Sequence, residues 1–144
     1  MDSRKFFYEL GKLIYQIDVE YETYGKSESI NAPNLLWILY ALNDGQPHTQ
    51  RQICDDWQIP RSTANTIVKD LQKEGLVELS HLNGTRREMT IKLTEKGLSY
   101  ADSVLQKLYL REQVVYDKMK NPEKFLKDLK SFTEILSLLN KEEN

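Results

Sequence analysis

The sequence is poor in the residues that form covalent cross-links and metal sites. Its 144 residues include one cysteine, Cys54, and two histidines, His48 and His81. A single cysteine excludes an internal disulfide framework, and these scattered ligands do not have the spacing of a zinc site. The sequence therefore predicts a fold held together by a hydrophobic core, with no metal and no cofactor.

Long apolar runs and a strong excess of one charge are also missing. No apolar stretch approaches the ~20 residues of a membrane span, and the N-terminal residues 1–13 do not have the pattern of a signal peptide. The chain has 20 basic and 22 acidic residues, a net charge of −2, which argues against a general polycation. We expect a soluble, cytoplasmic protein that makes no membrane contact.

The middle of the chain is its least acidic part, because residues 46–97 hold eight basic and seven acidic side chains. Taken alone, this charge pattern is most simply a solvated surface of mixed charge.

Helical periodicity flanks this middle part. Apolar residues recur every three or four positions between Phe6 and Tyr21, and Ala32-Pro33 begins a second, more apolar helix that ends before Asn43. A long helical pattern follows Thr94, and Asn121-Pro122 begins a last helix with a heptad-like apolar seam.

The stretch TQRQICDDWQIPRSTANTIVKDLQKEG, residues 49–75, predicts two short helices joined by Gln58-Ile59-Pro60. Thr49 and Gln52 fit a capping box at the start of the first helix, and Trp57 is expected to face the core. The second helix ends at Gly75, a suitable residue for a helix C-terminus. Its predicted inward residues are Ala64, Ile67, Val68 and Leu71.

After Gly75 the period changes from helical to two. Val77 and Leu79 alternate with polar residues, as do Met89, Ile91 and Leu93, and Asn83-Gly84 between them is a strong hairpin signal. We expect a two-stranded ribbon with Arg86 and Arg87 at its tip.

Two helices with a tight turn, followed by a hairpin, describe a winged helix-turn-helix. A major groove ~12 Å wide accepts one helix, and the preceding helix braces it across the DNA backbone. Polar and basic side chains on the outer face suit base edges and phosphates, and arginines at the wing tip suit a minor groove. The predicted DNA-binding residues are Arg61, Ser62, Thr63, Asn65, Thr66, Lys69, Lys73, Arg86 and Arg87.

At this point the whole chain resembles the MarR (multiple antibiotic resistance regulator) family of bacterial transcriptional regulators. APNLLWILYAL is similar to the second helix of that family, residues 49–78 to its helix-turn-helix, and NGTRREMTIKLTEKG to its wing and wing exit. The resemblance implies a mainly α fold with a small β-hairpin, in which helices 1–31 and 98–144 dimerise and 32–97 bind DNA.

The resemblance also implies partners. A two-fold homodimer would set two recognition helices ~34 Å apart and select a near-palindromic operator in double-stranded DNA. Repression of nearby genes would follow by blocking polymerase. Members of the family commonly bind small aromatic effectors, for which the candidate lining is Tyr15, Trp37, Tyr40, Tyr100 and Tyr109. Ordinary core and interface aromatics are an equally good interpretation of these five residues.

Three positions depart from the family pattern. One is Pro60, which stands where a capping serine or threonine is usual. Thr85 stands where the wing usually has an aspartate that orients the arginine at position 87, so the wing geometry is open. Gln58 stands where glycine is frequent, and a left-handed glutamine costs roughly 1 kcal/mol over glycine. If the turn conforms, another interaction must support Gln58.

Other residues that attract attention have simpler interpretations. Cys54 is expected to be a core thiol rather than a redox sensor, and Trp37 and Trp57 are expected in the core. His48 and His81 are expected to be isolated surface residues, and Asp55-Asp56 to turn away from DNA or to pair with a cation.

Three classes of function remain in competition. The first is a dimeric, sequence-specific DNA-binding regulator. The second is a winged-helix adaptor that binds proteins and has lost specific DNA binding, which the acidic balance and the missing wing aspartate suggest. The third, an enzyme, is disfavoured because no nucleophile–histidine pair, phosphate loop or carboxylate pair stands out.

Overall fold

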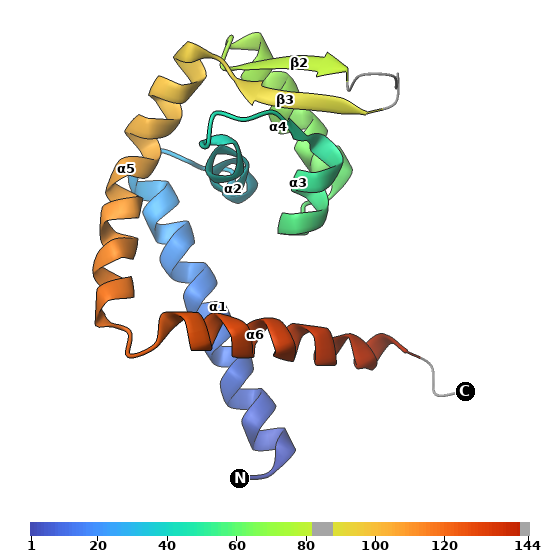
Figure 1. Ribbon diagram of the computed structural model, residues 1–144, viewed down its shortest axis with the longest axis vertical. Coiled ribbons are helices and arrows are strands. Elements are labelled where there is room, and N and C mark those ends of the chain that lie inside the picture. Colours follow the sequence, from blue (N-terminus) through green and yellow to red (C-terminus); the bar gives the residue numbers. More distant parts are fainter. Residues whose placement is uncertain (82–87, 142–144) are drawn as a thin grey trace. The chain divides into compact units, whose positions relative to one another are not determined.

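The structure is a computed structural model that describes residues 1–81 and 88–141 (Figure 1). Helices predominate and one small sheet accompanies them, so the predicted fold class is confirmed. The elements in chain order are α1 (Ser3–Ser27), α2 (Pro33–Leu42), β1 (His48–Thr49), α3 (Gln50–Trp57), α4 (Arg61–Lys73), β2 (Val77–His81), β3 (Met89–Leu93), α5 (Glu95–Lys118), α6 (Pro122–Leu136) and a 3₁₀ turn, Ser137–Asn140.

The chain forms two compact units, Met1–Gln106 and Lys107–Asn144. The first holds α1 to α4, the sheet and the first half of α5, and the second holds the rest of α5 and α6. The three-part division at residues 31 and 97 stays a prediction. No helix within residues 1–81 and 88–141 is long and apolar enough to cross a membrane.

The core of the first unit is built around α2. As its nearly continuous apolar sequence predicts, four of its side chains are buried, and three of them, Ile38, Leu39 and Leu42, are fully inaccessible. The helices α3, α4 and α5 and the strand β3 each contribute buried apolar side chains, as amphipathic helices and half-buried strands must. These side chains include Ile53, Val68, Leu71, Ile91, Leu93, Ala101 and Leu105.

Helix ends are capped largely where the sequence predicts. Asn121 accepts a hydrogen bond from the Lys124 amide at 3.0 Å, and Thr49 Oγ1 accepts one from the Gln52 amide at 3.1 Å. The predicted capping box is nevertheless only half formed, because the Gln52 side chain donates to Asp56 at 2.7 Å. The i, i+4 partner lies on the same helix face and is therefore within easier reach than the cap.

The sheet has three strands rather than the predicted two. β2 and β3 pair antiparallel as expected, with Leu79 opposite Ile91, and the short β1 adds to the other edge of β3 in the order β1-β3-β2. The ribbon prediction was wrong on this point because a two-residue strand has no periodicity to detect. The predicted turn at Leu82-Asn83-Gly84 lies outside the described residues.

The start of α5 is joined tightly to the end of α4. Gly75, at φ +73°, ends α4 as predicted, and the amide of Leu76 returns to the Leu71 carbonyl at 2.9 Å. Thr94 Oγ1 donates to the Gly75 carbonyl at 2.7 Å and accepts from the Gly97 amide at 3.0 Å. Thr94 therefore caps α5 and ties the exit of the hairpin to the helix before it.

Candidate nucleic-acid interface

The turn between α3 and α4 adopts the left-handed conformation at Gln58, which is energetically unfavourable for a glutamine. Gln58 is left-handed, at φ 50° and ψ 42°. Its Nε2 donates to the Asp55 carbonyl at 2.7 Å, and the next amide, that of Ile59, donates to the Cys54 carbonyl at 3.1 Å. The Ile59 side chain is buried and anchors the turn to the core. This anchor and the two hydrogen bonds stabilise the left-handed backbone of Gln58.

Small buried side chains allow the two helices of the motif to lie close together. Cys54 on α3 and Ala64 on α4 are both buried, and each removes bulk at the helix crossing. Burial raises the pKa of the Cys54 thiol, against an opposing influence from the positive charge of Arg61. A buried, protonated thiol is a poor nucleophile, and the prediction of a core thiol is confirmed by its burial.

The outer face of α4 presents the predicted polar and basic residues to solvent. Ile67 and Thr63 are half-buried at the edges of this face, whereas Ala64, Val68 and Leu71 fill the inner face. One rigid element of 13 residues thus brings together seven of the nine predicted DNA-binding residues. The exposed ones are Arg61, Ser62, Asn65, Thr66, Lys69 and Lys73.

Two of these polar side chains are already hydrogen-bonded within the protein. Thr66 Oγ1 donates to the Ser62 carbonyl at 3.1 Å. Asn65 Oδ1 accepts a hydrogen bond from Nε2 of Gln50, the first residue of α3. Hydrogen bonds within the protein therefore restrain the Asn65 and Thr66 side chains on this face, and amide groups are among those that read base edges.

A hollow of about 660 Å³ lies beside this face. Its lining comes from the starts of α3 and α4 and from the base of the wing, and includes Arg51, Arg61 and Asn65. Arg51 forms an exposed ion pair with Glu88 at 3.8 Å, a pair worth less than about 1 kcal/mol. Arg51 therefore remains able to exchange its carboxylate partner for a phosphate.

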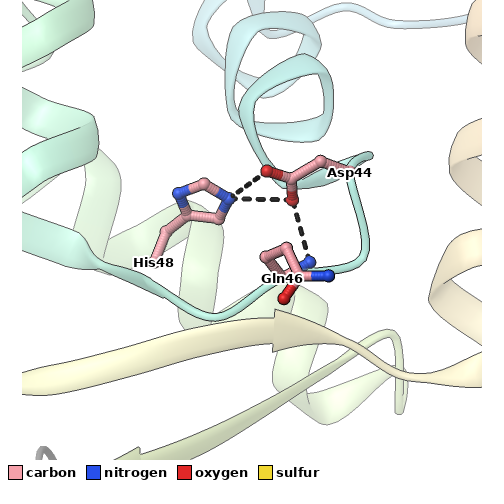
Figure 2. Close-up of polar contacts among 3 residues, drawn as sticks. All are labelled: Asp44, Gln46 and His48. Atoms are coloured by element: carbon pink, nitrogen blue, oxygen red, sulfur yellow. Dashed lines mark hydrogen bonds and ion pairs between the residues drawn. The ribbon is translucent and has the colours of Figure 1, made fainter.

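The loop before α3 is held by a carboxylate clamp (Figure 2). Nε2 of His48 lies 2.9 Å from both oxygens of Asp44, and the Gln46 amide donates to the same carboxylate at 2.9 Å. Burial acts to raise the pKa of Asp44, but the hydrogen bonds from His48 and Gln46 outweigh it and lower this pKa. The expectation that His48 is isolated was wrong, because its ring contacts the carboxylate of Asp44, four residues earlier in the chain.

Trp57 is not a core residue, contrary to the prediction. Its side chain is 36% exposed and stacks on Trp37 of α2, with ring centroids 4.9 Å apart and planes at 18°. Tyr40 and Tyr21 also border this aromatic cluster. The apolar position at the end of α3 points toward α2 at the surface, where stacking replaces burial.

The five candidate pocket aromatics are only partly brought together. Trp37 and Tyr40 lie 6.1 Å apart in the aromatic cluster, whereas Tyr15 is 74% exposed on α1. Tyr100 is half-buried on the first half of α5, and Tyr109 belongs to the second unit.

The acidic pair on α3 is exposed, and Asp56 accepts from an amide, Gln52, rather than from the expected cation. Arg86 and Arg87 lie outside the described residues, as does Thr85. Gln50 and Arg51 were missed by the sequence reasoning, although both follow the predicted cap Thr49 directly. Their position at a helix start beside the paired helix was the available signal.

Taken together, the braced helix pair, the exposed polar face of α4 and the antiparallel sheet define a winged helix-turn-helix protein. Residues 34–88 match the family model described as MarR family. Over 67 residues the chain is 33% identical to the HTH-type transcriptional repressor NicR of Pseudomonas putida, a match that covers 46% of this chain and 42% of that repressor.

Solved structures extend the similarity over the whole chain. NMB1585, a MarR family regulator from Neisseria meningitidis, matches with a TM-score of 0.83 and 25% identity, covering 98% of this chain and 100% of that one. A putative MarR family regulator from Listeria monocytogenes, solved with a 26mer DNA, has the same fold at a TM-score of 0.68 and 20% identity, covering 96% of each chain. Residues 34–88 therefore carry the sequence pattern of the MarR family, the chain has the fold of solved MarR family regulators, and the matched relatives are transcriptional regulators.

Proposed function

We propose that the protein is a homodimeric, sequence-specific regulator that binds a near-palindromic operator in double-stranded DNA and represses nearby genes. The observation that carries the proposal is the outer face of α4, where polar and basic side chains stand exposed on a helix braced by α3. An operator on the chromosome would place the protein in the cytoplasm. The Listeria regulator solved with DNA supports the same mode of action.

Exposed apolar side chains in each unit support dimerisation. In the first unit, α1 exposes Phe6, Phe7, Leu13, Ile14 and Ile17 by 44–55%. In the second, α6 exposes Phe125, Leu126, Leu129 and Ile135 by 41–66%. Such runs of apolar surface are typical of interfaces, and a second copy of the chain would cover them.

A small aromatic effector is the regulatory part of the proposal. A hollow of about 300 Å³ is lined by residues of α1 and α2 that include Tyr21 and Trp37, and its volume is at the lower end of small-molecule sites. An aromatic ring bound here would contact Trp37 and so change the fluorescence of the stacked Trp37 and Trp57. Titration with a series of phenolic acids should change tryptophan fluorescence and weaken operator binding together, and a series that changes neither would remove the effector from the proposal.

Binding to the protein's own upstream DNA at increasing salt tests the main proposal. Affinity should fall steeply with salt, because phosphate contacts release counterions. Lys69→Ala should weaken binding and lower the slope of log affinity against log salt by about one unit, and Arg87→Ala should weaken binding to most sequences. Lys12→Ala removes a cation from α1 instead and should leave the slope unchanged.

DNA binding that is weak, does not depend on salt concentration and does not change when Arg61, Lys69 or Arg87 is substituted would favour the adaptor hypothesis instead. The protein would then be a winged-helix module for protein partners.

A further inference from the structure

The backbone of Gln50 is held in place by the strand before it and by the helix that it begins. It follows β1 directly, and β1 is held in the sheet by the pairing of Thr49 with Thr90. It also begins α3, whose first turn is capped by the Thr49 hydroxyl on the Gln52 amide. The backbone of Gln50 is thus set by a strand and a helix cap together, and its half-buried side chain extends toward α4.

The side chain that Gln50 reaches is Asn65, exposed on the outer face of α4. Gln50 Nε2 donates to Asn65 Oδ1. A primary amide carries its acceptor oxygen at one end and its two N–H donors at the other, so a bond to the oxygen also determines where the donors point. An unrestrained Asn65 could turn either end toward a ligand, whereas the paired Asn65 keeps its oxygen toward α3.

We propose that Gln50 is a positioning residue that makes Asn65 meet DNA as a hydrogen-bond donor. This inference rests on the proposed function, because it assumes that α4 enters the major groove. There, guanine offers N7 and O6, adenine N7, and thymine O4 as acceptors, whereas cytosine offers the N4 amino donor. The base facing Asn65 is therefore discriminated against cytosine by roughly tenfold.

A purely structural role for the pair makes a different prediction. If Gln50 only ties α3 to α4, its substitution changes the free energy of unfolding and lowers affinity for all operators equally. If Gln50 sets the direction of the Asn65 amide, its substitution changes which base is preferred at one operator position.

Gln50→Glu separates the two roles. A carboxylate accepts hydrogen bonds and does not donate them, so the substituted side chain can pair only with the Asn65 N–H end, which turns the Asn65 oxygen outward. Gln52→Glu is the matched control, because it adds the same charge in the same helical turn, where the native side chain bonds Asp56 and not Asn65. Gln50→Ala, which leaves Asn65 unrestrained, is the second variant in case Gln50→Glu does not fold.

The measurement is the affinity of each full-length variant for the operator and for its single-base substitutions, together with its urea unfolding. We expect Gln50→Glu to shift preference at one position toward cytosine or toward the N6 amino group of adenine. Gln50→Ala should flatten that preference, and Asn65→Ala should abolish it. Gln52→Glu should weaken binding to all operator sequences equally, because it adds a negative charge.

An unchanged base profile in Gln50→Glu and Gln50→Ala, with wild-type binding still sequence-specific, would overturn this inference and leave the proposed function standing. A wild-type protein with no sequence preference at all would overturn both. The two failures are therefore distinguished by the wild-type profile.

Discussion

At the scale of the residue, single side chains compensate for local departures from ideal chemistry. Gln58 occupies a left-handed position where a side chain is strained, and its own amide bond to the Asp55 carbonyl offsets part of that strain. Asp44 similarly fixes a loop by accepting from His48 and Gln46 at once. Both are local solutions, because each side chain finds its partners within four residues along the chain.

Substitutions at Gln58 should separate the strain from the hydrogen bond. Gln58→Ala keeps the left-handed strain and removes the bond, so it should destabilise the protein by about 1 kcal/mol. Gln58→Gly removes both, and should be more stable than the alanine variant by about 1 kcal/mol. Urea unfolding measures both free energies, and equal stability of the two variants would show that the turn is not strained.

The Asp44 clamp should give a pH-dependent contribution to stability. The pKa of Asp44 is lowered in the folded chain from its ordinary value of 3.8, so the contribution is present above that pH and is lost as the pH falls through the lowered value. Since Asp44 is half-exposed, the contribution should stay below about 1 kcal/mol.

Asp44→Asn removes the carboxylate and should be less stable than wild type at pH 5, with the difference shrinking below pH 3.8. Urea unfolding midpoints of the wild type and Asp44→Asn, measured from pH 5 to below pH 3.8, test this prediction. A difference that stays constant throughout would mean that the carboxylate charge has no part in the clamp.

At the scale of the element, the junction of α4, the hairpin and α5 sets how the wing is joined to α4. Gly97 on the first turn of α5 packs directly against the Leu76 carbonyl, and a Cβ there would clash with that backbone oxygen. The glycine of the Leu-Thr-x-x-Gly wing exit is therefore required by close approach of two backbones. Thr94 caps the same turn.

Gly97→Ala should consequently destabilise the protein by about 1–3 kcal/mol, the range for overpacking. Gly25→Ala, in helix α1, is the matched control, because its added Cβ would meet Ile30, beyond the end of that helix, at ordinary contact distances of 3.6 Å and more. Thermal unfolding should show a lower Tm for the first variant only. A Tm equal to wild type in Gly97→Ala would mean that α5 can shift away from Leu76 without cost.

At the scale of the whole molecule, each unit leaves apolar surface exposed, which the proposed homodimer would cover. On α6 the exposed Phe125 and Leu129 follow the heptad-like spacing of the sequence. Burial of such side chains against a second copy contributes about 25 cal/mol per Å². A monomer would keep them in water.

Sedimentation of the wild type should therefore show a dimer, and Phe125→Glu combined with Leu129→Glu should shift it toward monomer or lower its solubility. Lys127→Glu changes a charge on the same helix away from that seam and should leave the dimer intact. A wild-type monomer at micromolar concentration would contradict the dimer, and with it the spacing of two recognition helices.

The sequence alone determined the helices, the β2–β3 hairpin strands and much of the candidate interface, but not the short strand β1. Helix spans, the end of α4 at Gly75 and the exposed side of α4 follow from periodicity and from residue chemistry within a few positions, whereas a left-handed Gln58 was expected only if the turn conformed to the family pattern. Such signals are local, and local signals can be detected along a single chain.

Tertiary structure decided the contacts between residues far apart in the sequence. The pairing of β1 with β3, the stack of Trp57 on Trp37 and the bond from Gln50 to Asn65 each join segments that no periodicity relates. Their partners are chosen by how the helices and the sheet pack around α2. For that physical reason the sequence could indicate which face of α4 is polar and exposed, while the direction of the Asn65 amide on that face became visible only in the fold.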